Sequence, residues 1–171
     1  MKTLAAFLLC FGLQLAAQNM QSCPMHQEHS GKSTHQADVE KNGDQAMGFP
    51  HDKTTHHFRL YEDGGAIEVT VNDQKDATNL QAIRSHLTHI AMLFSNGDFA
   101  IPMFVHDQVP PGVSVMKEKR AVISYQYEEV AGGARVRIKT ADPAALSAIY
   151  AFLRFQIEDH HTGDILKANG H

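Results

Sequence analysis

Cysteine is scarce in this chain, and tryptophan is absent. Of the two cysteines among 171 residues, Cys10 falls in an apolar N-terminal run, so removal of that run leaves Cys23 alone. A single cysteine excludes a disulfide framework within the mature chain. The motifs Cys-x-x-Cys-His, His-Glu-x-x-His and Gly-x-Ser-x-Gly are also missing, as is a phosphate-binding glycine loop. These absences exclude covalent c-type haem by the usual attachment and several common enzyme signatures.

Long hydrophobic runs and clusters of basic residues are lacking too. The longest apolar run, residues 4–17, follows Lys2 and is too short to cross a bilayer, which predicts a signal peptide over residues 1–17 rather than a membrane anchor. We therefore expect a periplasmic or secreted protein with no membrane span after signal cleavage. The net charge of −4, without a Lys or Arg cluster, makes nucleic acid an unsuitable partner.

Histidine, in contrast, is abundant: the chain has twelve, all beyond the predicted signal peptide. Residues 18–46 are polar and show neither helical nor strand periodicity, which predicts a flexible tail. This tail carries Cys23, Met25, His26 and His29, side chains that favour copper and zinc over calcium or magnesium. Cys23 has three other interpretations: a disulfide with a second chain, the attachment of a lipid, and a free thiol on a flexible tail.

The run Cys23-Pro24-Met25-His26 resembles the opening of the short heavy-metal-binding modules attached to copper-efflux adaptors and metal-pumping ATPases. The resemblance covers residues 22–29 only. Gln27 stands where those modules have a proline, and the chain lacks their second cysteine-containing knuckle, so a closed site of two cysteine pairs is not available. The resemblance implies a looser site for a copper or zinc ion, and a metal-efflux or metal-acceptor protein as a partner.

Regular patterning begins near residue 55. Residues 55–61 and 66–71 alternate between apolar and polar side chains on either side of Gly64-Gly65, which predicts a β-hairpin. Residues 76–96 then carry apolar side chains at the three-four spacing of one buried helical stripe. The first half of the predicted domain therefore has the order strand, strand, helix.

The second half has the same order. Residues 120–130 and 134–140 are predicted strands on either side of a Gly-Gly turn. A helix is predicted to begin at Asp142-Pro143, a capping acid followed by a proline in the first turn, and to continue to Asp159.

Together these elements predict an α+β fold, with a four-stranded antiparallel sheet and two helices on one face. The predicted domain covers residues 47–164, and residues 165–171 form a C-terminal tail. The connection over residues 96–119 is predicted to be mostly without secondary structure. Because it is rich in apolar side chains, we expect it to pack over the domain and to bring Met103 and His106 with it.

The stretch from Met47 to Asp164 resembles a group of exported bacterial proteins whose activity is uncharacterised. The resemblance implies one folded domain over this span and transfers no activity. It rests on the runs Thr54-Thr55-His56-His57-Phe58, Gly64-Gly65-Ala66-Ile67-Glu68-Val69, Ile83-Arg84-x-His86-Leu87-x-His89-Ile90-Ala91, Pro102-Met103-x-x-His106 and Phe152-Leu153-Arg154-Phe155-Gln156-Ile157-x-Asp159-His160.

The predicted domain adds further candidate metal ligands. His86 and His89 lie three residues apart on one helical face, which is a common chelating spacing. For each histidine an ordinary structural role is the alternative: a hydrogen-bonded core residue, or an imidazolium near a helix C-terminus. The candidates on the domain are His56, His86, His89, Met103, His106 and His160.

These observations favour a transition-metal-binding protein, with a copper or zinc ion as its ligand, that acts in metal buffering or delivery outside the cytoplasm. A metal-dependent enzyme is the first alternative, in which an acid such as Asp107 or Glu158, or else Asp159 or Asp164, would act as a general base beside the histidines. Non-covalent haem binding through histidine and methionine is the second. Since enzyme signatures are missing, we expect a binding protein rather than an enzyme.

Overall fold

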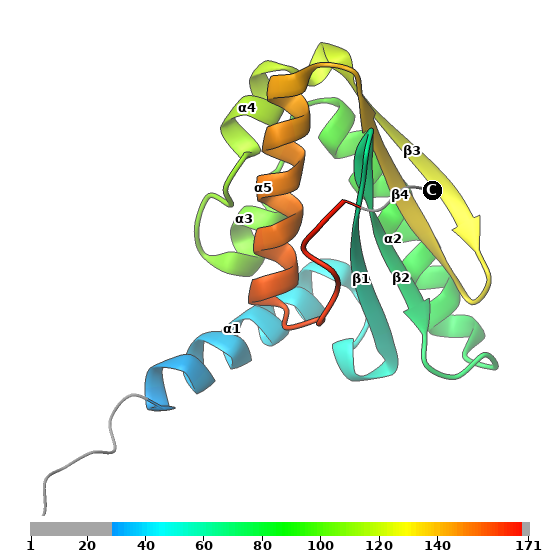
Figure 1. Ribbon diagram of the computed structural model, residues 1–171. Helices are drawn as coiled ribbons and strands as arrows, with labels where there is room; N and C mark the ends of the chain where they lie inside the picture. Colours follow the sequence, from blue (N-terminus) through cyan, green and yellow to red (C-terminus); the bar gives the residue numbers. More distant parts are fainter. Residues whose placement is uncertain (1–28, 169–171) are drawn as a thin grey trace, which may run out of the picture.

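The computed structural model describes residues 29–168, with side chains described from residue 34 onward. The predicted signal peptide and the candidate ligands Cys23, Met25 and His26 lie outside the described residues, and so does the side chain of His29. The strands are β1 (Thr54–Tyr61), β2 (Gly64–Val71), β3 (Ile123–Val130) and β4 (Gly133–Thr140). The helices are α1 (His29–Met47), α2 (Ala77–Ser95), α3 (Ala100–His106), α4 (Val113–Glu118) and α5 (Pro143–Asp159) (Figure 1).

The four strands form one antiparallel sheet in the spatial order β1-β2-β4-β3, as predicted. Each hairpin closes through a two-residue turn, because Tyr61 pairs with Gly64 and Val130 pairs with Gly133. The two hairpins meet along β2 and β4, where Ile67 lies opposite Val136. Successive side chains along each strand point to opposite faces of the sheet, and the apolar ones gather on one face.

Helices α2 and α5 cover this apolar face, which confirms the predicted α+β architecture. Helix α2 follows the first hairpin but packs mainly against β3 and β4 of the second one. Helix α5 follows the second hairpin and packs mainly against β1 and β2 of the first one. Each helix therefore covers the hairpin contributed by the other half of the chain (Figure 1).

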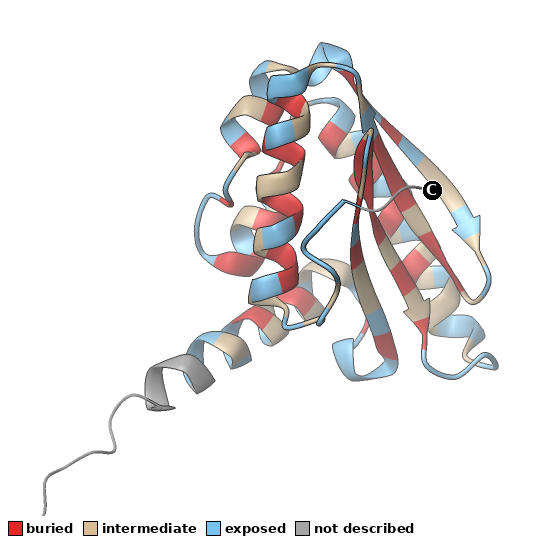
Figure 2. Cartoon of the chain, viewed as in Figure 1, coloured by how far each residue is buried: buried red, intermediate tan, exposed pale blue. Residues whose placement is uncertain are grey.

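The core lies between the sheet and these two helices, where buried residues line both inner surfaces (Figure 2). The predicted apolar stripe of α2 is buried, with the largest contribution from Phe94, which packs against Phe99 and Phe152. Asp142 caps α5 by accepting hydrogen bonds from two backbone amides of its first turn, as the Asp-Pro signal predicts. The helix cap of α5 and the packing of the core are therefore both consistent with the predicted elements.

Helix α1 corrects the prediction of a flexible tail for residues 29–46. Its inner face consists of Gln36, Val39, Gly43 and Met47. Only Val39 and Met47 have large apolar side chains, so the sequence shows no hydrophobic stripe. Val39 and Gly43 are nevertheless buried, mainly against α3. The helix ends at Gly48, which has a φ of 77° and donates its amide to the Asp44 carbonyl at 3.0 Å, an αL helix ending.

The connection between α2 and β3 also differs from its prediction, because it contains two short helices. Helix α3 buries Pro102 and Val105, and α4 buries Val113 and Met116, so the predicted packing of this segment over the domain is confirmed. Gly112 starts α4 with a φ of 84°, and a Cβ there would lie 2.1 Å from a backbone oxygen of α5. Helix α4 can approach α5 this closely only because residue 112 is glycine.

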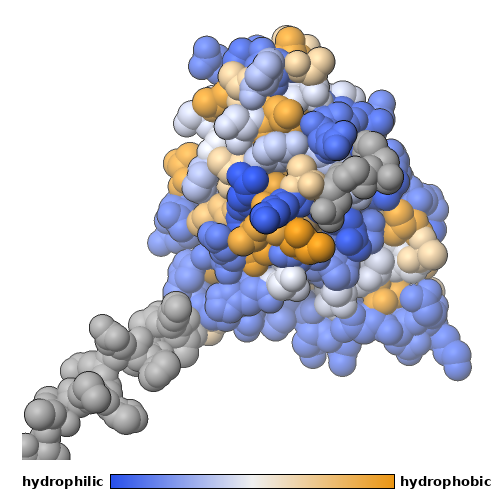
Figure 3. All heavy atoms as spheres, viewed as in Figure 1, coloured by the Kyte–Doolittle hydropathy of each residue, from blue (hydrophilic) through white to orange (hydrophobic). Residues whose placement is uncertain are grey.

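Among residues 29–168, no helix is long and apolar enough to cross a membrane. Hydrophobic residues on the face shown in Figure 3 are interspersed with hydrophilic ones. The large apolar side chains that are exposed come from separate parts of the fold: Met92, Phe104, Val109, Val122, Ile165 and Leu166.

Candidate functional site

A small cavity lies between the sheet and helices α1, α2, α3 and α5, at the end of the core nearest α1. Its volume is about 70 Å³. Most of its wall is hydrophobic and is contributed by Phe58, Ile67, Val69, Leu87, Ile90, Phe94, Ile101, Pro102, Val105 and Phe152. Such a lining is typical of a ligand site when a few polar groups converge on it.

Four imidazoles and one thioether also line this wall, and each comes from a different part of the chain. They are Met47 at the end of α1, His56 on β1, His86 on α2, His106 at the end of α3 and His160 just after α5. The fold therefore brings together four of the histidines that the sequence analysis selects.

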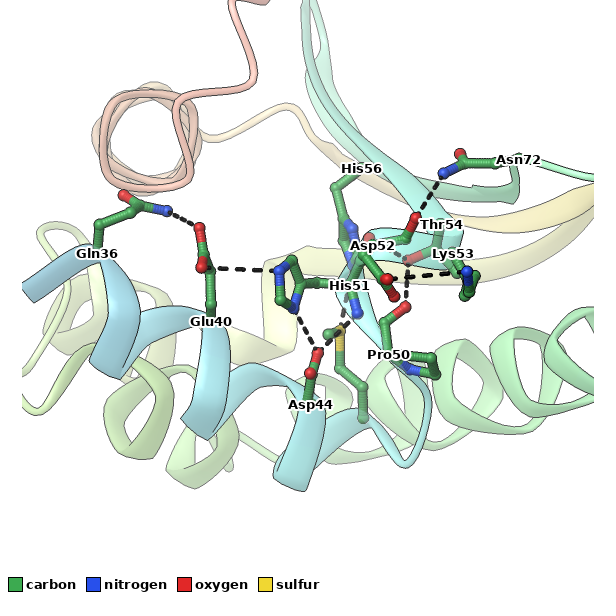
Figure 4. Close-up of polar contacts among 11 residues, drawn as sticks. Gln36, Glu40, Asp44, Pro50, His51, Asp52, Lys53, Thr54, His56 and Asn72 are labelled. Atoms are coloured by element: carbon green, nitrogen blue, oxygen red, sulfur yellow. Dashed lines mark hydrogen bonds and ion pairs between the residues drawn. The ribbon is translucent and has the colours of Figure 1, made fainter. Parts of the chain in front are cut away.

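His56 Nε2 and Met47 Sδ are in direct contact, with 3.2 Å between the two atoms. Figure 4 shows this contact as a dashed line from the His56 ring to the sulfur atom. Phe49 stacks on the His56 ring, with 6.3 Å between ring centroids and an interplanar angle of 21°. The His56 ring therefore contacts both an aromatic ring and a thioether.

His160 is the next imidazole along this wall. Its ring is nearly parallel to that of His56, with an interplanar angle of 4° and a centroid distance of 6.2 Å. It also stacks on Phe58 at 5.5 Å and contacts the ring of His106 at 4.9 Å. His86 lies on the α2 side and touches the edge of Phe49 at 5.8 Å.

Burial keeps three of these imidazoles uncharged. It lowers the pKa of His56 to about 4, with the neighbouring His86 as a further cause. Burial likewise lowers the pKa of His86 to about 4 and the pKa of His160 to about 3. A protonated ring in this apolar wall would lose its hydration, so the neutral form, which retains one lone pair for a ligand, prevails at neutral pH.

His106 is held differently, because both of its ring nitrogens have protein partners. Nδ1 donates to Asp159 at 2.5 Å, and Nε2 lies 3.0 Å from the Oε1 atom of Gln156. Asp159 also accepts a hydrogen bond from His35 of α1 at 2.9 Å. Burial alone raises the pKa of Asp159, but the hydrogen bonds from His35 and His106 lower it below its usual value. We therefore assign His106 to positioning.

Met47, His56 and His160 also line a second space, an outer groove of about 250 Å³ beneath α1. They separate this groove from the inner cavity. His51 anchors α1 beside the groove: its backbone amide donates to Asp44 at 2.7 Å, and its ring lies 3.6 Å from Glu40 (Figure 4). An ion entering from the groove would meet the three side chains before reaching the cavity.

The remaining candidates lie elsewhere. His89 is exposed on the outer side of α2, and Met103 is not part of the cavity wall. Of the proposed general bases, Asp107 and Glu158 are exposed and do not line the cavity. The acid that the structure places beside a cavity histidine is Asp159, which accepts from His106 Nδ1.

Met47 and Gln156 are not among the candidates from the sequence, whereas Asp159 is one of the proposed general bases. Met47 was placed at a domain boundary, and only the helical spacing with Val39 and Gly43 could have indicated that it points inward. Gln156 lies in the apolar stripe of α5 itself, one residue before Ile157, and a polar residue in that position is a signal that was available.

The cavity is far smaller than the roughly 300 Å³ at the lower end of pockets for drug-sized ligands, so it offers the haem alternative no support. Within residues 29–168, no group of three or more His, Cys, Asp or Glu side chains is arranged to hold a metal ion. A site at the cavity wall would therefore have to include the Met47 sulfur. Comparison with protein-family models, curated proteins and solved structures finds no match for this chain.

Proposed function

We propose that the protein binds a transition-metal ion, Cu(I) in preference to Zn(II), and that it buffers or delivers this ion outside the cytoplasm. The observation that carries the proposal is the 3.2 Å contact between His56 Nε2 and Met47 Sδ. Metal–nitrogen and metal–sulfur bonds of about 2.0 and 2.3 Å add to about 4.3 Å, so both atoms can reach one ion.

The chemistry of the pair favours copper. Thioether sulfur selects Cu(I), whereas zinc sites usually combine thiolate, imidazole and carboxylate ligands in a closed tetrahedron. His160 is our candidate for a third ligand, because its ring lies next to that of His56, with 6.2 Å between the ring centroids. Both rings are uncharged at neutral pH because burial lowers their pKa values, and a metal requires an unprotonated nitrogen.

The candidate ligands of the N-terminal segment suggest how this site would be supplied with metal. Cys23, Met25 and His26 precede α1, whose last residue is Met47. We propose that these side chains capture the ion and that the Met47–His56 pair receives it. Delivery to a metal-efflux or metal-acceptor protein would follow, in line with the resemblance of residues 22–29 to heavy-metal-binding modules.

A competition titration of the full chain against a chromophoric Cu(I) chelator tests the proposal. We expect stoichiometric binding of Cu(I), and a loss of affinity of at least about tenfold in Met47→Leu and in His56→Ala, since each removes one bond to the ion. The double variant Cys23→Ser with His26→Ala reports the contribution of the N-terminal segment. Met92→Leu, an exposed methionine on α2, is the matched control.

The results separate the parts of the proposal. Equal affinity in the wild type and in Met47→Leu would remove the cavity wall from the site while leaving the N-terminal segment as a binder. If neither Cu(I) nor Zn(II) binds with micromolar or tighter affinity, the metal-binding function is wrong.

A further inference from the structure

His51 lies where helix α1 and strand β1 meet, and it contacts two carboxylates of α1. It belongs to a short 3-10 turn, His51–Lys53, that leads into β1. Glu40 and Asp44 are four residues apart on α1, so they lie on the same face of the helix. Both extend toward the His51 ring, one to each of its nitrogens (Figure 4).

Asp44 fixes the orientation of His51. Its Oδ1 atom accepts a hydrogen bond from the His51 backbone amide at 2.7 Å and lies 3.0 Å from the ring nitrogen Nδ1. Because an ionised carboxylate only accepts hydrogen bonds, Nδ1 carries the proton. The other ring nitrogen, Nε2, is directed toward Glu40. A histidine that binds a metal typically donates its other nitrogen to a carboxylate in this way.

Gln36 orients Glu40 in the same manner. Its Nε2 amide group donates to Glu40 Oε1 at 3.1 Å, which leaves Oε2 facing His51. His51 Nε2 and Glu40 Oε2 are 3.6 Å apart, too far for a hydrogen bond. The two atoms therefore face each other without a direct bond, although each side chain is held by a partner of its own.

The separation of 3.6 Å suits a zinc ion bound by both atoms. Zn–N and Zn–O bonds of about 2.0–2.2 Å at a tetrahedral angle place the two ligand atoms about 3.4 Å apart. The right angle of a square-planar Cu(II) site would place them only about 2.9 Å apart. Cu(I) prefers thiolate and thioether sulfur, and neither atom here is sulfur. The pair therefore favours Zn(II) over either form of copper.

The charge and the accessibility of this pair are also suitable. Glu40 and Asp44 carry two negative charges, and among residues 34–168 neither lies within ion-pair distance of a Lys or Arg side chain. The side chains of His51 and Glu40 are 44% and 40% exposed, and both line the outer groove. An ion can reach them directly from solvent, and water can occupy the remaining positions around it.

We propose that His51 Nε2 and Glu40 Oε2 bind one Zn(II) ion at the edge of the outer groove, with Asp44 and Gln36 as positioning residues. Since only two ligands come from the protein, the site is weaker than a structural zinc site and exchanges its ion readily. A bound ion joins α1 to the turn that precedes β1. The site is separate from the Met47–His56 pair and does not depend on Cu(I) binding there.

A Zn(II) titration of metal-free, ¹⁵N-labelled full-length protein tests this site, followed through the ring nitrogens of histidine. The His51 signals are assigned by their absence in His51→Gln. We expect a saturable change of the His51 Nε2 signal with half-saturation on the order of 100 µM, because two ligands supply about half the binding free energy of a four-ligand site. Since the signal is specific to His51, zinc bound by Cys23 or His26 does not interfere.

His57 is an internal control. Its Nδ1 atom pairs with Asp164 at 2.9 Å, much as His51 pairs with Asp44, and Asp164 also accepts from a backbone amide. Among residues 34–168, no second carboxylate lies within ion-pair distance of the His57 ring. The His57 Nε2 signal should therefore stay unchanged over the same range of Zn(II) concentration.

Glu40→Gln keeps the shape of the side chain and removes its charge. We expect it to weaken Zn(II) binding at His51 by about tenfold or more, and Met47→Leu to leave this binding unchanged. The proposal is overturned by equal affinity in Glu40→Gln, or by a His51 signal that shows no saturable change up to about ten times the expected half-saturation. In either case the contact is an ordinary surface ion pair. Because Met47→Leu reports on Cu(I) binding and Glu40→Gln on Zn(II) binding, failure of one site does not imply failure of the other.

Discussion

The Asp164 carboxylate holds the end of the chain against the outer edge of the sheet. One of its oxygens accepts from the His57 ring at 2.9 Å, and the other accepts from the backbone amide of Phe58 at 2.9 Å. Burial alone raises the pKa of Asp164, but hydrogen bonds from Phe58, Thr162 and His57 lower it overall. A single side chain thus satisfies a backbone amide of the edge strand β1.

Replacement Asp164→Ala is expected to lower the free energy of unfolding by about 1–3 kcal/mol, because it leaves the Phe58 amide and the His57 ring without their partner. Urea denaturation at neutral pH measures the change. Asp52→Ala is the control: Asp52 is exposed and its side chain forms a surface ion pair with Lys53 at 3.8 Å. Equal stability of the Asp164→Ala and Asp52→Ala variants would contradict a docked C-terminal segment.

Single residues of the cavity were predictable where they follow a strand or helix pattern. His56 alternates with Phe58 on β1 and is therefore expected to face inward, as it does. His89 follows the spacing rule with His86 but lies on the solvent side of α2. The spacing of two histidines on a helix does not indicate which face of that helix other elements of the fold will cover.

At the scale of elements, the long and periodic segments were predictable and the short or polar ones were not. Both hairpins, α2 and α5 have apolar side chains at the correct repeat over many residues. Helices α3 and α4 span seven and six residues, too few for a repeat to appear. Helix α1 is long, but its buried face is built around Gly43 and one valine, Val39, so tertiary contacts rather than a hydrophobic stripe define it.

Gly43 provides a test of α1. Glycine in a helix interior destabilises it by roughly 0.5–1 kcal/mol relative to alanine, and a Cβ at this position would meet only the Met47 methyl carbon, at an ordinary 3.5 Å. Gly43→Ala should therefore raise the free energy of unfolding by about this amount. Ala37→Gly, at an exposed position of the same helix, should lower it by a similar amount. Both are measured by thermal unfolding, and no change in either variant would show that α1 unfolds apart from the domain.

The N-cap of α5 is a second element-scale test. Asp142 accepts from the backbone amides of Ala144 and Ala145 at 2.9 Å and pairs with Lys119 at 2.9 Å. These contacts, with the Ala145 amide first, lower the pKa of Asp142. Asp142→Ala should destabilise the protein by about 1–2 kcal/mol in chemical denaturation. Lys119→Ala, which removes the ion pair but keeps the cap, should lower the free energy of unfolding by less than about 1 kcal/mol. A larger decrease would show that the ion pair, and not the cap, stabilises the helix.

At the scale of the whole molecule, three partly buried imidazoles make stability depend on pH. The folded pKa of His56 and of His86 is about 4 and that of His160 is about 3, all below the unfolded value of 6.5. Between pH 6.5 and pH 4 the unfolded chain binds more protons than the folded one. The stabilisation is therefore complete above pH 6.5 and is lost as the pH falls toward 4.

We expect the free energy of unfolding of the metal-free protein to fall by on the order of a few kcal/mol between pH 7.5 and pH 4.5, since each pKa unit corresponds to about 1.4 kcal/mol. Urea titrations at several pH values measure the slope. His160→Gln should flatten it, and His89→Gln, at an exposed position, should leave it unchanged. A pH-independent stability would show that the imidazoles are open to solvent.

The exchange of helices between the two hairpins has a consequence for how the chain folds. Because α2 packs mainly on β3 and β4, and α5 mainly on β1 and β2, neither half encloses an apolar core of its own. A chain cut within residues 107–112 would yield two fragments that cannot fold separately and can fold when mixed. Folding must also wait for contacts between residues distant in sequence, so the protein should fold slowly and in one cooperative step.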